Sequence, residues 1–177
     1  MELLPLDTPE RFNLAAQWLA QKENYQWLDF GDGRQTVSPE WLKISMQRGS
    51  VVLRLFTRAA DEPPIGIVAL GNINPQFKTA NIWVVVGDKS YLARGYATRA
   101  SSKMMTLGFS ELGLHAIHTW IVEHNPSVRM TKRLNFHFIG RQRQCHWIDG
   151  RAYDRLWFDL LSTEHQEMLD VTHRRTA

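Results

Sequence analysis

The sequence predicts an α+β protein of α/β/α layers, with helices over a central, mostly antiparallel mixed sheet of about seven strands. Two observations predict this class. The β-type segments at 50–57, 65–73 and 81–86 are joined by short turns, which is typical of an antiparallel meander. Apolar residues then recur at helical spacing over 95–112, and β-type segments return after this helix. One sheet, interrupted along the chain by one long helix, is therefore expected.

Two helices are expected before the meander. Thr8-Pro9 fits an N-cap followed by proline at the first helical position, and it predicts a helix over 9–22. Ser38-Pro39 starts a second helix in the same way, and Gly49 ends it. The segment between them, 24–37, is a loop by composition and carries several aromatic side chains.

The last third of the chain predicts a strand, a short helix and a hairpin. The strand covers 117–122, and the helix covers 126–134. Strands at 136–147 and 152–161 are expected to pair across Asp149-Gly150, because this dipeptide favours a tight hairpin turn. From residue 162 onward the sequence indicates a solvated helix or a frayed tail.

Bulk composition describes one globular domain over 1–177. The chain has 177 residues, of which 44% are hydrophobic and 22% charged, in the range of proteins that bury a core. Cys145 is the single cysteine, so an intrachain disulfide is excluded and a reducing cytoplasm is the expected location. Neither a signal peptide nor an apolar run of membrane-spanning length is expected. The composition also predicts no metal site.

The formal net charge is only +3, but basic residues gather in one part of the sequence. The cluster consists of Arg129, Lys132, Arg133, Arg141 and Arg143. It can meet the phosphates of a cofactor or of a nucleic acid, or it can be a solvated face. Aromatic residues are not regularly interleaved with it, so nucleic acid is not the expected partner.

The segment 84–100 carries the strongest sign of a binding site. An apolar strand runs through a turn of small residues, Ala93, Gly95 and Ala97, into the long helix. Free N–H groups and the helix dipole make such an N-terminus an anion site, and small residues allow a phosphate to approach the backbone. An ordinary strand-to-helix turn remains the alternative. The segment lacks the P-loop lysine and the glycine spacing of a dinucleotide fingerprint.

This turn resembles that of the GNAT acetyltransferase superfamily, and within it the branch of RimJ- and RimL-like ribosomal-protein N-acetyltransferases. The family turn reads Gln/Arg-x-x-Gly-x-Gly/Ala, followed by Thr/Ser-x-Ala. Here Gly95, Ala97, Thr98 and Ala100 fit it, and Leu92 departs from it. A second block of the family fits at the expected distance, through Asn125, Ser127, Arg133, Leu134, Asn135 and Phe136. The likeness extends over 65–161, including the closing hairpin.

The resemblance implies a single-domain N-acetyltransferase that moves acetyl from acetyl-CoA to a primary amine, on a protein N-terminus or a small molecule, by direct attack in a ternary complex. An acyl-CoA-binding module without turnover is the alternative. Residues 1–49 would form a helical wall beside the acceptor, 50–161 the sheet and cofactor site, and 162–177 a tail. By resemblance, the cofactor-binding residues are Val84, Val85, Val86, Leu92, Ala93, Arg94, Gly95, Tyr96, Ala97, Thr98, Asn125, Ser127 and Arg133.

The catalytic groups and the acceptor are less specified. A main-chain N–H near Val85 is a candidate oxyanion donor. Many family members place a tyrosine acid where this chain has Thr131, so that acid is excluded. The remaining candidates for proton transfer are Glu123, His124 and Ser127, although the first two also fit an exposed strand end. The acceptor-side candidates, which core packing explains about as well, are Tyr25, Trp27, Phe30 and Asp32. A monomer or homodimer is expected.

Overall fold

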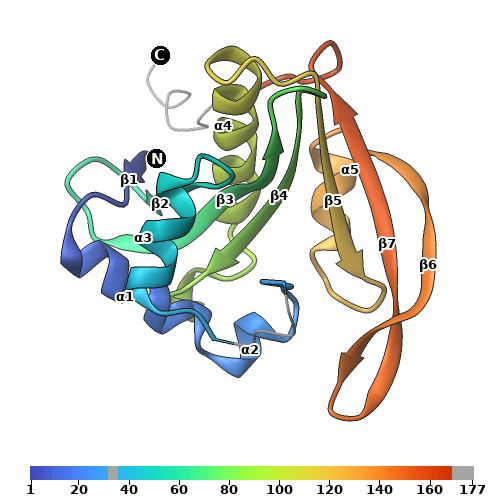
Figure 1. Cartoon of the computed structure of the whole chain (residues 1–177), viewed down its shortest axis with the longest axis horizontal. Coiled ribbons are helices and arrows are strands. Elements are labelled where there is room, and N and C mark those ends of the chain that lie inside the picture. Colours follow the sequence, from blue (N-terminus) through green and yellow to red (C-terminus); the bar gives the residue numbers. More distant parts are fainter. Residues whose placement is uncertain (32–35, 169–177) are drawn as a thin grey trace, which may run out of the picture.

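The structure is a computed structural model and describes residues 1–31 and 36–168. These residues form a sheet of seven strands in the order β1-β2-β3-β4-β5-β7-β6 (Figure 1). Neighbouring strands are antiparallel except for the parallel pair β4 and β5, which confirms the predicted mixed sheet. The strands are β1 (Leu3–Pro5), β2 (Val52–Thr57), β3 (Pro64–Asn74), β4 (Thr79–Val86), β5 (Ala116–Val122), β6 (His137–Ile148) and β7 (Arg151–Leu161).

Helices cover both faces of this sheet. They are α1 (Pro9–Leu19), α2 (Lys22–Tyr25), α3 (Pro39–Gln47), α4 (Tyr96–Ser110), α5 (Val128–Arg133) and the 3-10 helix η1 (Lys89–Tyr91). α4 packs on one face of β3 and β4, where Met104 and Met105 are fully buried. α1 and α3 pack on the other face through Leu19 and Leu42 (Figure 1). The predicted α/β/α layers are therefore confirmed.

The predicted helix starts agree with the cap geometry. Thr8 Oγ1 accepts a hydrogen bond from the N–H of Arg11 at 3.4 Å, and Ser38 Oγ accepts one from Trp41 at 3.1 Å. A proline follows each cap, as the sequence predicted. Each side chain satisfies one N–H that the helix itself leaves without an acceptor, which typically stabilises a helix by about 1 kcal/mol.

Three short elements escape the sequence prediction. α1 ends at Leu19, before the expected residue 22, and Lys22–Tyr25 forms a separate helix, α2, which extends into the segment 24–37 that was expected to be a loop. β1 and η1 are also unpredicted. Each of these elements is shorter than two periods of its own hydrophobic pattern, so periodicity does not reveal it.

β4 is buried on both faces, and its side chains alternate between the two layers. Ile82, Val84 and Val86 pack towards α4. Trp83 and Val85 pack towards α1 and α3. This alternation follows from the two-residue period of a strand. The all-apolar run in the sequence therefore serves two cores at once.

Residues 162–168 correct the expectation of a solvated helix or frayed tail. The segment forms a turn and then an irregular stretch that lies against α4. A ring nitrogen of His165 lies 2.8 Å from Thr106 Oγ1, and the N–H of Met168 donates to Ser102 Oγ at 2.8 Å. These polar contacts and the Met168 side chain fix the segment. Residues 169–177 of the expected tail lie outside the described residues.

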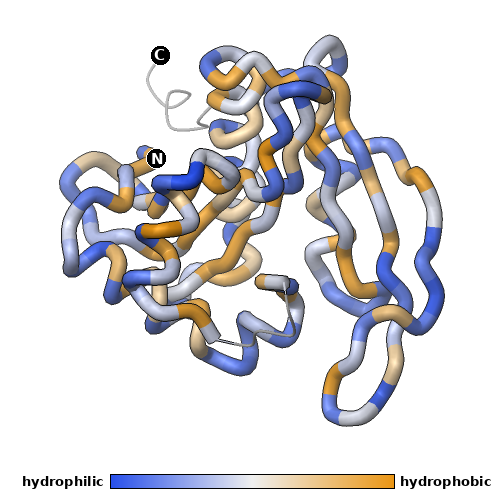
Figure 2. The backbone as a smooth tube through the Cα atoms, in the orientation of Figure 1, coloured by the Kyte–Doolittle hydropathy of each residue, from blue (hydrophilic) through white to orange (hydrophobic). Residues whose placement is uncertain are grey.

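The outer strand β6 has the polar character of a sheet edge. Its tube is largely hydrophilic along its length (Figure 2), and most of its residues are exposed. The turn that joins it to β7 has positive φ at Asp149 and Gly150, 50° and 76°, as the hairpin signal predicted. No helix within residues 1–31 and 36–168 has the length and apolar character needed to cross a bilayer.

Candidate functional site

β4 and β5 separate after a short stretch of pairing. They pair from Thr79 to Asn81 on β4, with Ala116 to His118 on β5. One further link crosses the gap, because Thr119 Oγ1 donates to the carbonyl of Ile82 at 2.9 Å. Beyond it the two strands diverge (Figure 1). The sheet is therefore open in its middle, between the end of β4 and the end of β5.

Backbone groups of β4 face this opening. The N–H of Gly87 donates to Ile65 on β3, at 2.9 Å, and Val85 pairs with Ile67 on the same side. Because peptide groups alternate along a strand, those of Val84 and Val86 point away from β3 and into the opening. The peptide groups of Val85 itself face β3. The main-chain N–H groups near Val85 that face the opening, as an oxyanion donor must, are therefore those of Val84 and Val86.

A cavity of about 800 Å³ occupies the opening. Val84, which packs towards α4, and Trp83, which packs towards α1, both line it. The cavity therefore reaches both faces of the sheet. At one end it meets the start of α4, and at the other it meets α2 and the residues that follow it.

The start of α4 has the geometry of an anion site. Gly95 is the N-cap, with φ of 80°, and carries no side chain to cap the helix. The N–H groups of Tyr96, Ala97 and Thr98 have no acceptor inside the helix, and the helix dipole adds positive potential there. Ala93 also has positive φ, 60°, which costs a non-glycine residue about 1 to 3 kcal/mol. The turn therefore holds a backbone shape that its sequence does not favour.

The predicted second block folds against the same cavity. Asn125 Oδ1 accepts from the N–H of Ser127 at 2.9 Å and from Ser127 Oγ at 2.7 Å. Asn135 has φ of 61°, which confirms the left-handed conformation predicted for it. Thr131 is buried, and its Oγ1 donates to the carbonyl of Val128 at 2.8 Å. The hydroxyl at the family's tyrosine position is therefore used within α5.

Comparison with known proteins gives the family. Residues 1–137 match the sequence model described as the acetyltransferase (GNAT) domain. The chain belongs to the GNAT acetyltransferases. This confirms the resemblance that the turn and the second block indicated, and GNAT enzymes take acetyl-CoA as their acetyl donor.

Relatives and solved structures agree with this family. The provisionally named ribosomal N-acetyltransferase YdaF of Bacillus subtilis is 24% identical over 149 residues, which cover 78% of each chain. Spermidine N-acetyltransferase of Vibrio cholerae, solved with CoA and spermine, has a TM-score of 0.79 at 17% identity, over 92% and 96% of the two chains. RimJ of Mycobacterium smegmatis, solved with CoA-disulfide, has a TM-score of 0.74 at 18% identity, over 92% and 82%. These two structural matches show the shared fold.

Most of the predicted cofactor-binding residues of this GNAT chain line the cavity. They are Val84, Val85, Val86, Leu92, Ala93, Gly95, Tyr96, Ala97, Thr98, Asn125, Ser127 and Arg133. Arg94 is the exception, since its guanidinium lies over the Tyr91 ring, 5.7 Å from the centroid. The basic residue Arg129 lines the cavity together with Arg133. Two basic residues of the predicted cluster therefore line the cavity.

Other predicted residues do not reach the cavity. Glu123 accepts from the N–H of Asp154 at 3.3 Å and lies 3.5 Å from Arg141, so β7 and β6 hold it. The His124 ring packs against Trp27 and Tyr153, with centroids 5.1 and 4.3 Å apart.

Of the acceptor-side candidates, only Trp27 lines the cavity among the described residues. Phe30 packs edge-to-face on Trp41 and Trp83, which makes it a support for the cavity wall. Tyr25 lies at the end of α2 without lining the cavity. Asp32 lies outside the described residues.

Sequence reasoning missed a lysine that ties α2 to the end of β4. Lys89 Nζ donates to the carbonyl of Val86 at 2.9 Å and to Asn24 Oδ1, and it lies 3.6 Å from Glu23 Oε1. All four residues line the cavity. Lys89 therefore fixes α2 next to the end of β4. A lone lysine after a strand gives no sequence signal for this role.

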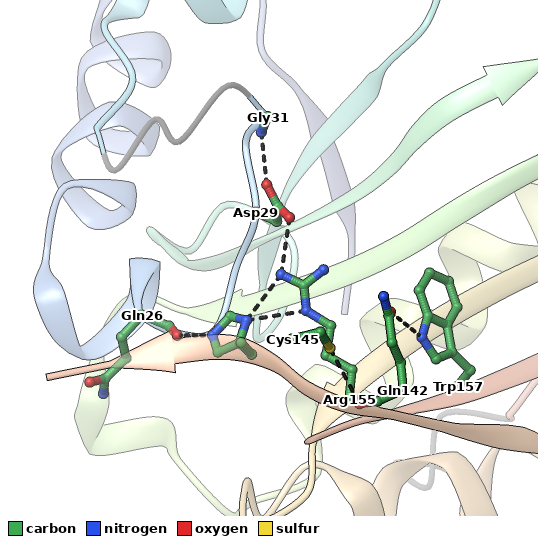
Figure 3. Close-up of polar contacts among 8 residues, drawn as sticks. Gln26, Asp29, Gly31, Gln142, Cys145, Arg155 and Trp157 are labelled. Carbon is green, nitrogen blue, oxygen red and sulfur yellow. Dashed lines mark hydrogen bonds and ion pairs between the residues drawn. The ribbon is translucent and has the colours of Figure 1, made fainter. Parts of the chain in front are cut away.

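A polar network fastens the loop after α2 to the closing hairpin (Figure 3). Arg155 donates to Asp29 Oδ2 at 3.0 Å and, through Nε, to His146 Nδ1 at 3.2 Å. Since Nδ1 accepts, the proton is on Nε2, which donates to the carbonyl of Gln26 at 2.7 Å. The Arg155 guanidinium also covers the Trp120 ring at 3.9 Å, and Trp120 lines the cavity.

The pKa shifts in this network favour the protonation states that its hydrogen bonds require. Burial is the main cause that lowers the pKa of His146, so the neutral ring is favoured. Burial alone would raise the pKa of Asp29, but the N–H of Gly31 and the Arg155 guanidinium outweigh it and hold that pKa below its usual value. A charged Asp29 and a neutral His146 are thus the partners that Arg155 requires.

Proposed function

We propose that this chain transfers acetyl from acetyl-CoA to a primary amine, by direct attack of the amine while both substrates are bound. The supporting observation is the cavity in the opening between β4 and β5, which connects an anion site at the start of α4 to a second entrance beside α2. Such a cavity brings a donor from one side and an acceptor from the other to the same strand. A direct transfer needs this arrangement.

At the donor end, the chain's own backbone would hold the cofactor. The N–H groups of Tyr96, Ala97 and Thr98 suit a pyrophosphate. Arg129 and Arg133 line the cavity and suit further phosphate. The peptide groups of Val84 and Val86 face the opening and suit the amides of an extended arm. Together these groups fit a long, phosphorylated thioester.

At the reaction centre, the residues would stabilise charge. Acetyl-CoA supplies an acyl carbon already activated as a thioester. The amine nitrogen forms the new C–N bond, the C–S bond breaks, the amine loses one proton and the sulfur gains one. A main-chain N–H of Val84 or Val86 suits the developing oxyanion. Of the predicted proton-transfer residues, Ser127 alone lines the cavity, so we retain it as the proton carrier in this proposal.

Two acceptor classes are suggested by the relatives of this chain. The names of the relatives include a spermidine acetyltransferase and a ribosomal N-acetyltransferase, which raise polyamines and protein N-termini as two acceptor classes. Both carry the primary or α-amine that this chemistry requires.

The test of this proposal is amine-dependent release of CoA. Purified protein is mixed with acetyl-CoA and each member of a panel of amines, and free thiol and acetylated product are measured together. The proposal expects equal amounts of both for at least one amine. A chain that binds acetyl-CoA in calorimetry but yields no acetylated amine from a broad panel would contradict it.

That second outcome would favour the other candidate, an acyl-CoA-binding module without turnover. The observation that favours this candidate is Thr131, whose hydroxyl donates within α5 where many relatives carry a tyrosine acid. The same binding and product measurements separate the two functions.

A further inference from the structure

The acceptor end of the cavity carries three tryptophans and one carboxylate. Trp27 follows α2, Trp83 lies on β4 and Trp120 on β5, and all three line the cavity. Glu23 is the single carboxylate among the described residues that line it. We call these three tryptophans, Glu23 and the adjacent Lys89 the acceptor end. Its walls are therefore mostly aromatic surface.

Other side chains hold these rings in place. Trp83 packs edge-to-face on Phe30, with centroids 6.5 Å apart. One face of Trp120 is covered by Arg155 at 3.9 Å. Trp27 meets the His124 ring edge-on at 5.1 Å. Rings fixed in this way present a shaped apolar surface, and flat groups pack on it without further ordering of the protein.

The charge of the acceptor end is already balanced. Lys89 Nζ lies 3.6 Å from Glu23 Oε1, and its bonds to Val86 and Asn24 fix it there. Asn24 is itself buried and donates to the carbonyl of Trp18 at 2.8 Å. A first ammonium group can share Glu23 with Lys89. Among the described residues that line the cavity, a second or third ammonium group would meet Lys89 with no further carboxylate to pair with.

We propose that the acceptor is a monoamine carried on a flat apolar body, an arylalkylamine in chemical class, and that the Glu23 and Lys89 pair selects against polyamines. The inference rests on the proposed transferase function. The tryptophans receive the body, and Glu23 receives the ammonium group on entry. As the amine moves further towards β4, the positive charge of Lys89 disfavours the protonated form of the amine. This favours the neutral amine, which is the form that attacks the thioester.

The first experiment compares kcat/KM for 2-phenylethylamine, ethylamine and spermidine on the wild-type protein. The expected result is a preference of about tenfold or more for 2-phenylethylamine over each of the others, the size typical of a filled apolar site. Spermidine equal to or better than 2-phenylethylamine overturns the inference, as does turnover with peptide N-termini alone. In both cases the transferase function survives, whereas absence of turnover with every amine overturns both.

The second experiment compares Lys89→Met with Lys43→Met, an exposed lysine on α3 outside the cavity lining. The ratio of kcat/KM for spermidine to that for 2-phenylethylamine should rise about tenfold in Lys89→Met, because one cation is lost from the acceptor end. It should stay constant in Lys43→Met. The ratio is taken within one preparation, so partial unfolding cancels. An unchanged ratio in Lys89→Met overturns the selective role of the pair.

Discussion

One end of the cavity presents mainly backbone groups and the other mainly side chains. At the start of α4 the groups proposed to bind the donor are peptide N–H groups, and Ala93, Gly95 and Ala97 matter because they are small. Beside α2 the surface proposed for the acceptor consists of side chains from α2 and the loop after it, from β4 and from β5. A backbone site tolerates changes of side chain that leave its N–H groups accessible. A side-chain site changes with every substitution, so acceptor choice can vary while the donor stays the same.

The largest effect is expected from a substitution that changes only the donor end of the cavity. In Gly95→Val a branched side chain enters the turn at φ of 80°, where it blocks the approach of phosphate to the N–H groups of α4. Affinity for acetyl-CoA should fall about 100-fold, or about 3 kcal/mol. Calorimetry with acetyl-CoA measures this loss.

The matched control for that variant is Gly113→Val. Gly113 has a similar φ of 63° and open space around it, and it does not line the cavity. The backbone strain of the two variants is thus comparable. Equal cofactor affinity in the two folded variants would show that the start of α4 is not the donor site.

A smaller effect is expected from the network behind the acceptor end. Arg155→Met removes the group that covers Trp120 and leaves Asp29 and His146 without their shared partner. We expect kcat/KM for the acceptor to fall about tenfold, while affinity for acetyl-CoA stays constant. The loss of a partner for buried His146 should also lower the free energy of unfolding by about 1 to 3 kcal/mol.

Arg151→Met provides the comparison for this variant. Arg151 lies on the same strand, is exposed and does not line the cavity, and its guanidinium lies 5.3 Å from the centroid of the Tyr153 ring. Steady-state kinetics, calorimetry and chemical denaturation of both variants separate the acceptor, donor and stability effects. A loss of acetyl-CoA affinity in Arg155→Met would mean that the two ends of the cavity are not independent.

The smallest expected effect is a dependence of stability on pH. Burial lowers the pKa of His118, His146 and His165 below the usual value of about 6.5. The unfolded chain therefore takes up protons near that pH before the folded chain does. Stability should be full above about pH 6.5 and should fall as the pH decreases below it, towards the lowered pKa values. Thermal denaturation at about pH 7.5 and about pH 5.5 measures the change.

The His146→Gln variant assigns part of this dependence to the acceptor end. It removes one of the three shifted rings, so its loss of stability between the two pH values should be smaller than that of the wild type. An identical pH dependence in the two proteins would show that His146 does not contribute.

Most residues that the sequence proposed for the donor end line the cavity, whereas most of those proposed for the acceptor do not, for one physical reason. The donor end depends on contiguous residues, where a strand, small residues and a helix follow in order, and so a local pattern reports it. Asn135 was likewise predictable, because few residues other than glycine adopt positive φ readily.

The acceptor end depends on residues that only tertiary structure brings together. Trp120 lines the cavity because β4 and β5 diverge, and Lys89 meets Asn24 across 65 positions in the chain. α2 is too short for a periodic signal, and it supplies Glu23. Glu123 and His124 have suitable chemistry and lie next to a motif in the sequence. In the fold, however, Glu123 contacts β7 and His124 packs against Trp27 and Tyr153, and neither lines the cavity.

The opening between β4 and β5 also exposes backbone groups with which other protein chains could pair. Unpaired peptide groups along a strand can form hydrogen bonds with an extended segment of another chain, which then adds to the sheet. Proteins usually shield such groups. Here the gap lies in the middle of the sheet, where edge charges and bulges give no protection. A donor molecule lying along Val84 and Val86 would shield it. Acetyl-CoA bound along these residues would then also protect the protein from such pairing.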